Sequence, residues 1–211
     1  GVPRPAIQLI ASGGQLRART RNFPHSDITD QMQKFTAAKV AECGRLDGFI
    51  FKRKSPSCGL GKVPIFTESG ELKNQTGVGL FAQAVMHSYP LLPCVEEHGL
   101  QVRSIRDFYY IRTRLLRNWH DSVGVNSRPC ELRRFHRWHF PLLNCCRQYR
   151  PAMKLQRLMG QCRQKNMRHV AGVYLKLLMT ALNQCHPQNV ARDKMRYWIR
   201  RTDQYPFISN G

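Results

Sequence analysis

The chain has 211 residues, of which 34 are Lys or Arg and 13 are Asp or Glu, so its formal net charge is +21. Hydrophobic residues make up 42% and charged residues 22%, a balance typical of a globular protein and not of a disordered one. No uninterrupted apolar run reaches the roughly 18 residues that span a bilayer, which excludes a transmembrane helix. The first residues, GVPRPAIQLI, lack the basic and apolar regions of a secretory signal, and the start at Gly indicates a fragment or a processed chain.

Charge divides the chain into two halves. Residues 1–100 contain 12 Lys or Arg against 8 Asp or Glu, a net charge of +4, whereas residues 101–211 contain 22 against 5, a net charge of +17. No acidic residue occurs between Glu131 and Asp193. Because charge of one sign destabilises a folded unit by self-repulsion, we expect a polyanionic partner, with nucleic acid as the first candidate and an anionic membrane surface as the second. The alternative is that the charge reflects a generally basic proteome.

The eight cysteines show no CxxC spacing, which disfavours a zinc ribbon. A chain of this length with long helices does not need disulfides, so we expect reduced thiols and a cytoplasmic location. Most of the cysteines are expected to be small buried residues. They are Cys43, Cys58, Cys94, Cys130, Cys145, Cys146, Cys162 and Cys185.

Strand and helix patterns alternate in the first half of the chain, which predicts a parallel sheet covered by helices. Asp27 or Thr29 is a candidate cap for the first helix, and Gly44 follows its end. Thr76 is a candidate cap for the second helix, which Pro90 stops. The expected elements are a strand at residues 6–10, a helix from 27 or 29 to 43, a strand at 48–52, a helix after 76 and a strand at 91–95.

The second half has apolar residues at helical spacing, for example Leu132, Phe135, Trp138 and Leu142. This pattern predicts helices over residues 101–119, 130–149, 166–184 and 189–203. Pro141 is expected to kink or break the second of them, and residues 121–129 are expected to form a linker. The predicted fold class is α/β, with a partial parallel-sheet, Rossmann-like domain followed by an all-α helical domain.

The segment KRKSPSCG, residues 52–59, follows the strand predicted at 48–52. In open parallel sheets ligands bind beyond the carboxyl ends of the strands, so the thiol of Cys58 is placed for chemistry or for metal ligation. The neighbouring cations favour the thiolate, which is the species that binds metal or attacks an electrophile. The alternative is a proline turn in which Cys58 fills a small pocket.

The stretch GFIFKRKSPSCG, followed by TGVGLFAQAVMHSYPLLPCVEE, closely resembles the thiouracil desulfidase (TudS-like) family, and GVPRPAIQLI and DITDQMQKF upstream fit the same family. Downstream, FHRWHFPLLNCCRQYR, LNQCHP and NVARDKMRYWIR resemble the YbgA-like domain of unknown function. The resemblance implies a TudS-like domain over residues 1–98 and a basic helical domain over residues 99–211. Such fusions are associated with removing sulfur from 4-thiouridine in transfer RNA (tRNA).

Members of the desulfidase family hold a 4Fe-4S cluster with three cysteines, and the resemblance makes Cys58 one of these ligands. The resemblance implies that such a cluster would supply Lewis-acid chemistry toward the substrate sulfur, with water as the attacking group at the thiocarbonyl carbon. Ser55 matches a position proposed to assist proton transfer or to orient the substrate, and a turn-forming hydroxyl is the alternative. The other two cluster cysteines and a glutamate belong to motifs upstream of VPRP. The resemblance therefore implies an N-terminally truncated chain with one of three ligands.

Aromatic residues interleave with arginines between Trp119 and Tyr149, a pattern that suits RNA because aromatic rings stack on bases and arginines bind phosphates. Core packing is the alternative for each aromatic residue. His136 and His139 share a helix face, where RNA contact or core packing is favoured over metal ligation. The Gly-Val-Gly turn at residues 77–79 offers amides to a phosphate or, alternatively, allows tight packing. The residues expected to contact RNA are Lys54, Arg133, Arg134, Arg137, Arg147, Arg150 and Arg157.

The sequence thus predicts an iron–sulfur-dependent desulfidase that converts thiolated uracil or 4-thiouridine, in tRNA, to uridine and sulfide. The alternative is a non-catalytic, basic RNA-binding module without a cluster, which the missing upstream cysteines favour for this polypeptide. A membrane-surface protein is disfavoured because the aromatic residues are interspersed with cations instead of lying opposite them.

Overall fold

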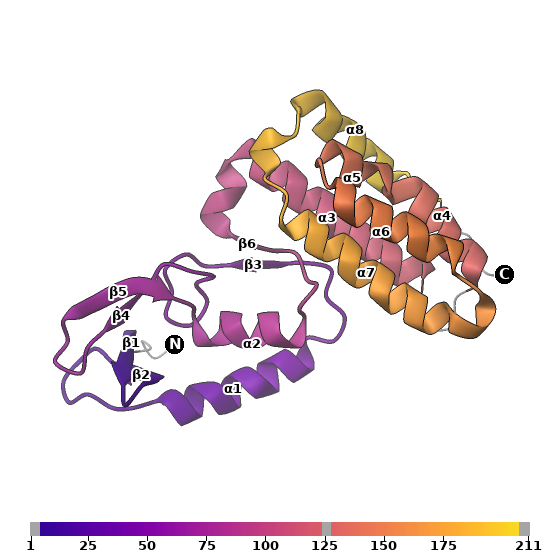
Figure 1. Ribbon diagram of the computed structural model, residues 1–211. Coiled ribbons are helices and arrows are strands. Elements are labelled where there is room, and N and C mark those ends of the chain that lie inside the picture. The colour runs from indigo at the N-terminus through magenta and orange to yellow at the C-terminus, as the bar shows by residue number, and fades with distance from the viewer. Residues whose placement is uncertain (1–4, 124–127, 207–211) are drawn as a thin grey trace. The chain divides into compact units, whose positions relative to one another are not determined.

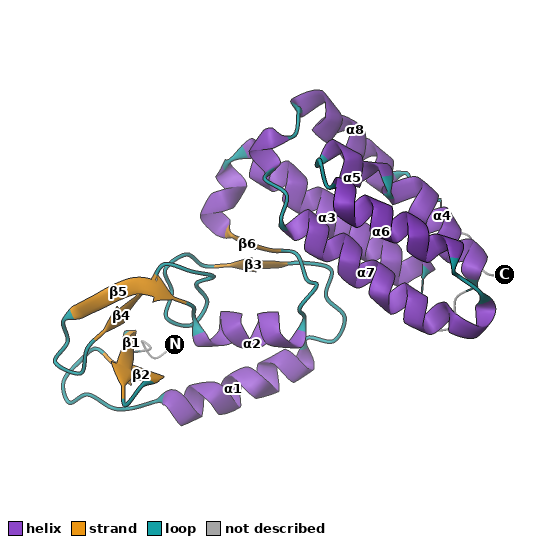
Figure 2. Cartoon of the chain, viewed as in Figure 1, coloured by secondary structure: helices purple, strands orange, loops and turns teal. Residues whose placement is uncertain are grey.

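The computed structural model describes residues 5–123 and 128–206 (Figure 1). Contacts divide them into two compact units: residues up to Pro90 with Cys94–Gly99, called the N-terminal unit here, and Leu91–Pro93 with the residues from Leu100 on, called the helical unit. The strands belong to the first part of the chain and the second part is helical (Figure 2), which confirms the α/β class followed by a helical region. None of the described helices is both long and apolar enough to cross a membrane.

The N-terminal unit contains six described strands and two α-helices. They are β1 (Ile7–Ser12), β2 (Gln15–Thr20), α1 (Thr29–Glu42), β3 (Phe49–Phe51), β4 (Val63–Phe66), β5 (Leu72–Gly77), α2 (Leu80–Ser88) and β6 (Cys94–Glu96).

A four-stranded sheet has the order β2-β1-β4-β5. β1 and β2 form a hairpin through Gly13 and Gly14, whose φ angles of +56° and +76° are left-handed values that glycine adopts without steric cost. β1 runs parallel to β4, whereas β5 returns antiparallel to β4. Leu9, Ala18 and Val63 form its buried core. This sheet is therefore mixed and not wholly parallel, because two short hairpins add an antiparallel strand at each edge.

A separate pair of strands, β3 and β6, runs parallel, with Phe51 opposite Glu96. Phe81 of α2 contacts Phe49 of β3 with ring centroids 5.9 Å apart, and α2 packs against α1. Beyond α2, the Tyr89 hydroxyl donates a hydrogen bond of 2.8 Å to the carbonyl of Gly44. The parallel pair places the carboxyl ends of β3 and β6 next to each other.

Gly44 follows the end of α1 as predicted, whereas the predicted N-caps of both helices are wrong. At α1 the N-cap is Ile28, which has no side-chain cap, and not Asp27 or Thr29. The Asp27 carboxylate accepts a 2.9 Å hydrogen bond from the Thr29 amide, and Gly44 has a φ of +56° just beyond the helix. Thr76 is not a cap, because it lies in β5 and α2 begins after Gly79.

The helical unit has six α-helices in its described residues: α3 (Arg103–Ser122), α4 (Pro129–His139), α5 (Pro141–Cys145), α6 (Tyr149–Gly160), α7 (Met167–Asn183) and α8 (Arg192–Asp203). α3 packs against α8 and α4, and α6 packs against α5 and α7. The core contains Phe108, Trp119, Phe135, Tyr174 and Trp198, all buried.

Two differences from the predicted helices concern the middle of this unit. Pro141 breaks the predicted helix 130–149 into α4 and α5, as expected, and the chain then forms α6, which the sequence analysis did not predict. α3 extends to Ser122 and α4 begins at Pro129, so the ends of the predicted linker 121–129 are helical. Residues 124–127 of that linker lie outside the described residues.

Candidate functional site

The segment 52–59 begins where β3 ends, at the carboxyl edge of the β3–β6 pair. Glu96 and Glu97 occupy the corresponding end of β6. The carboxyl edge of parallel strands is where ligands bind in open α/β sheets, so the predicted position of this loop is confirmed.

Ser55 organises the turn that contains Cys58. Its Oγ accepts hydrogen bonds from the backbone amides of Ser57 at 3.3 Å and Cys58 at 3.1 Å, and its carbonyl accepts one from Gly59 at 2.8 Å. This is the turn-forming role of a serine hydroxyl. A catalytic role of Ser55 stays a prediction.

Carbonyl groups of the same turn cap the N-terminus of α2. Pro56 O accepts the Leu80 amide at 3.1 Å, and Ser57 O accepts the amides of Phe81 and Ala82 at 2.9 and 3.2 Å. These amides would otherwise be the unpaired donors of the first helical turn. They are therefore not available to a phosphate, and the phosphate-binding interpretation of residues 77–79 finds no support at these atoms.

Gly79 is the point of closest approach between α2 and the loop. Its amide donates a 2.8 Å hydrogen bond to the carbonyl of Gly59, and a Cβ at this position would collide with the Ser57 carbonyl and stand 2.6 Å from the Cys58 nitrogen. The structure therefore supports tight packing, which was the alternative interpretation of the turn at residues 77–79.

Two glutamates fix the ends of the loop. Glu97 Oε2 accepts a 2.7 Å hydrogen bond from the Arg53 amide, and Glu96 Oε1 accepts one of 3.1 Å from the Leu60 amide. Glu96 is also 3.5 Å from His98 Nδ1. Neither glutamate was assigned a role from its sequence pattern. The signal that could have identified them is a pair of acids directly after a predicted strand.

Cys58 is half-buried, and its Sγ lies 3.5 Å from the hydroxyl of Ser57. The thiol is therefore not sealed in the core. Lys54 is exposed at the preceding turn, where its φ is +53°. The thiol and the hydroxyls of Ser55 and Ser57 thus come from one turn, with cationic side chains directly before it in the sequence.

The described residues do not provide a complete cluster site. Residues 5–123 and 128–206 contain no group of three His, Cys, Asp or Glu side chains that could hold a metal ion. Cys43 donates a 3.2 Å hydrogen bond to the Lys39 carbonyl of its own helix. Cys58 can supply one thiolate, so a 4Fe-4S cluster held by three cysteines does not fit the described residues alone. No disulfide joins the eight cysteines, all of which are described.

A cavity of about 740 Å³ lies elsewhere in the N-terminal unit, between α1 and α2. Its lining includes Thr36, Val40, Gln83 and His87, and none of its lining residues belongs to the 52–59 loop. The thiol-bearing turn is therefore a site on an edge and not part of this cavity.

Three of the arginines predicted to contact RNA lie on α4. Arg133 and Arg137 are exposed and four residues apart, so they share a helix face, whereas Arg134 is half-buried. Arg133 also donates a 3.3 Å hydrogen bond to the carbonyl of Cys162.

The other three predicted RNA-contacting arginines lie on α6 and in the turn before it. Arg150 and Arg157 are seven residues apart on α6 and therefore share a face. Arg147 is in the preceding turn with a φ of +55°. All three are exposed. The structure thus distributes the arginines over two helix surfaces.

Several aromatic residues of the interleaved pattern belong to the core. Trp119 and Phe135 are 6% and 0% exposed, and their rings meet edge to face with centroids 5.0 Å apart. They cannot contact RNA in this structure, and core packing is their role. Tyr149 is different, because 60% of it is exposed.

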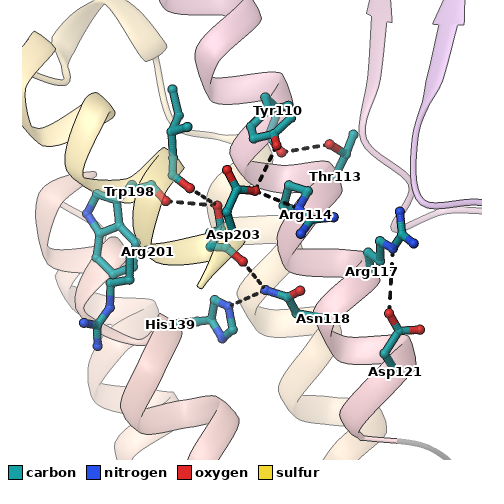
Figure 3. Close-up of polar contacts among 12 residues, drawn as sticks. Tyr110, Thr113, Arg114, Arg117, Asn118, Asp121, His139, Trp198, Arg201 and Asp203 are labelled. Carbon is teal, nitrogen blue, oxygen red and sulfur yellow. Dashed lines mark hydrogen bonds and ion pairs between the residues drawn. The ribbon is translucent and has the colours of Figure 1, made fainter. Parts of the chain in front are cut away.

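The two histidines of α4 have buried polar partners. Asn118 of α3 approaches His139 Nε2 at 3.3 Å and donates a 2.9 Å hydrogen bond to the Thr202 carbonyl (Figure 3). His136 Nδ1 lies 3.0 Å from the Tyr174 hydroxyl. Burial lowers the pKa of His139 to about 3 and the pKa of His136 to about 4, so both imidazoles are neutral. Core packing is confirmed for His139.

Comparison with known protein families identifies the N-terminal part of the chain. Residues 1–97 match a family model described as 2-thiouracil desulfurase. No curated protein and no solved structure matches the chain. The match confirms the family resemblance inferred for the N-terminal part and includes the Ser55–Cys58 turn. It does not reach the helical unit, for which the YbgA-like resemblance stays a prediction.

Proposed function

We propose that the chain removes sulfur from a thiolated uracil at the edge formed by the 52–59 loop. The match of residues 1–97 to the 2-thiouracil desulfurase family model, together with the half-buried thiol of Cys58 at the carboxyl edge of a parallel strand pair, supports this proposal. In the reaction, water oxygen replaces sulfur at the thiocarbonyl carbon and sulfide leaves. No electrons are gained or lost overall, so no external oxidant or reductant is needed.

Ser55 and Cys58 carry the chemistry in this proposal. The Ser55 Oγ accepts two backbone amides, and a hydroxyl that accepts in this way still has its own proton to donate to a base or a water molecule. Cys58 provides the sulfur ligand or nucleophile of the site. We propose a 4Fe-4S cluster at Cys58 only if further thiolates complete the site, and the described residues do not supply them.

For the natural substrate we propose a thiolated base in tRNA, bound through the helical unit. The cations of α4 and α6, on a stretch of chain without any acidic residue from 132 to 192, suit the phosphate backbone. A base inside a stack is inaccessible to an enzyme, so the thiolated base would have to leave its stack to reach Cys58.

The test uses the complete chain, prepared anaerobically with iron and sulfide, and incubated separately with 2-thiouracil and with tRNA containing 4-thiouridine. Sulfide release and loss of the thiocarbonyl absorbance are measured. We expect Cys58→Ala to abolish turnover. Cys43→Ala, which removes another half-buried thiol that bonds only to its own helix, is expected to keep it. Equal rates for Cys58→Ala and the unmodified chain would contradict the proposal.

A second candidate function is a non-catalytic RNA-binding module. The lack of a three-residue metal site among residues 5–123 and 128–206 favours it, because the cysteine site is then incomplete. The two functions differ in one result. Tight, salt-sensitive binding of tRNA without sulfide release from either substrate supports the module, whereas release that depends on Cys58 supports the enzyme.

A further inference from the structure

A hollow of about 650 Å³ lies on the surface of α5 and α6, outside the site described above. Phe140, at the junction of α4 and α5, and Asn144 of α5 line one side. Tyr149, Met153, Gln156 and Arg157 of α6 line the other. We call it the α5–α6 groove.

The lining of the α5–α6 groove is mostly apolar and open to solvent. Tyr149 is 60% exposed and Met153 is 68% exposed, and the two are four residues apart on one helix face. Contiguous exposed apolar surface is a feature of binding sites and ligand grooves. Phe140 is supported from below by His136, with ring centroids 4.5 Å apart, and His136 in turn lies 3.0 Å from the Tyr174 hydroxyl.

The lining of the groove also includes polar groups of the kinds that can bind a base or a phosphate. Asn144 and Gln156 each have an amide that can both donate and accept, which matches the edge of a base. Arg157 supplies a cation, and Arg150 lies seven residues away on the same face of α6. The chain around the groove has no acidic residue from 132 to 192, so the field favours an anionic occupant over a neutral or basic one.

We propose that the α5–α6 groove binds an unpaired nucleotide of RNA, with its base stacked on Tyr149 and its phosphate on Arg157. The inference rests on the proposed RNA partner and specifies where and how that partner is bound. Stacking on an aromatic ring tolerates any base, so the groove distinguishes unpaired from paired RNA and does not select a sequence.

The test compares binding of a fluorescent single-stranded RNA and a duplex of the same length to the complete chain. Tyr149→Ala is expected to weaken binding of the single strand by about 5- to 150-fold and to leave duplex binding unchanged. Tyr149→Phe, which keeps the ring, is expected to bind as the unmodified chain does. Arg157→Gln is expected to lower the slope of affinity against salt by about one released ion.

The control is Tyr197→Ala, because Tyr197 is a 50% exposed tyrosine on α8, outside the groove. If Tyr149→Ala binds the single strand as well as the unmodified chain does, or if Tyr197→Ala weakens it equally, the groove proposal is overturned while an RNA partner stands. If the unmodified chain binds neither RNA, the proposed RNA partner fails as well. Binding of an amphipathic peptide is measured in the same way. If the groove variants abolish binding of the peptide and leave RNA binding unchanged, the occupant is a protein helix and the proposal is overturned.

Discussion

The hydroxyl of Ser55 accepts the backbone amide of Cys58 at 3.1 Å, so the position of the thiol depends on a side chain three residues earlier. The same oxygen accepts the Ser57 amide at 3.3 Å. One serine side chain therefore fixes the backbone amides of both Ser57 and Cys58. We expect a substitution at Ser55 to change the backbone conformation at Cys58.

We expect Ser55→Ala to accelerate hydrogen exchange at the amides of Ser57 and Cys58 by about 2- to 10-fold, because a net contribution of about 1 kcal/mol is lost with the acceptor. Exchange is measured residue by residue by NMR. Ser57→Ala is the control, because the hydrogen bond that the structure gives the Ser57 hydroxyl is to the Cys58 thiol and not to a backbone amide of the turn. Unchanged exchange in Ser55→Ala would show that the hydroxyl does not hold the turn.

Gly79→Ala is expected to displace the loop from α2, because its new Cβ would collide with the Ser57 carbonyl. Exchange at the amides of Leu80–Ala82 should rise, and the reaction rate of Cys58 with a thiol reagent should change. Gly61→Ala is a matched control, since a Cβ there meets nothing within 4 Å. The same behaviour in both variants would refute the steric explanation.

Asn118→Ala is expected to reduce the unfolding free energy of the helical unit by about 1–3 kcal/mol, because the Thr202 carbonyl and His139 Nε2 each lose a buried partner. All three tryptophans of the chain lie in the helical unit, so tryptophan fluorescence during urea unfolding reports on that unit. The exposed Asn183, which accepts a surface hydrogen bond from Arg112, gives the control Asn183→Ala, with a change below about 0.5 kcal/mol. Equal losses in both variants would contradict a special role for Asn118.

Acid is expected to destabilise the helical unit through His139. Burial, with Arg201 acting in the same direction, lowers the pKa of its imidazole from 6.5 to about 3. Because this folded-state pKa is lower than the unfolded-state pKa, the contribution of His139 to the unfolding free energy is complete above pH 6.5. That contribution is lost as the pH falls toward 3, and the unfolding free energy is expected to be about 3 kcal/mol lower at pH 4. NMR titration of the His139 imidazole measures this pKa directly. A midpoint near 6.5 for His139 would contradict it.

Strong periodicity was sufficient to predict some elements. Helix α7 carries a long apolar stripe, and Pro141 cannot continue an α-helix from α4. The β2 strand was missed because only Leu16 and Ala18 face inward between polar side chains. The β5 strand was missed because it is an edge strand with a single buried residue, Gly77.

Helix α6 was missed because it has few buried positions, Ala152 and Leu155, and a proline in its first turn. At the site, turn-forming residues after an apolar strand were enough to place Cys58. For Glu96 and Glu97 the sequence offers only the position of two acids directly after a predicted strand. Their hydrogen bonds to the loop depend on β6 pairing with β3, more than 40 residues earlier in the chain.

The anchoring of the 52–59 loop at Arg53, at Leu60 and against the first turn of α2 fixes its length. Most surface loops accept inserted residues at little cost. Here one added residue between Ser55 and Gly59 would break the register between the turn and the helix that it caps. Related chains with the same site should therefore vary in the residues of this segment but not in their number.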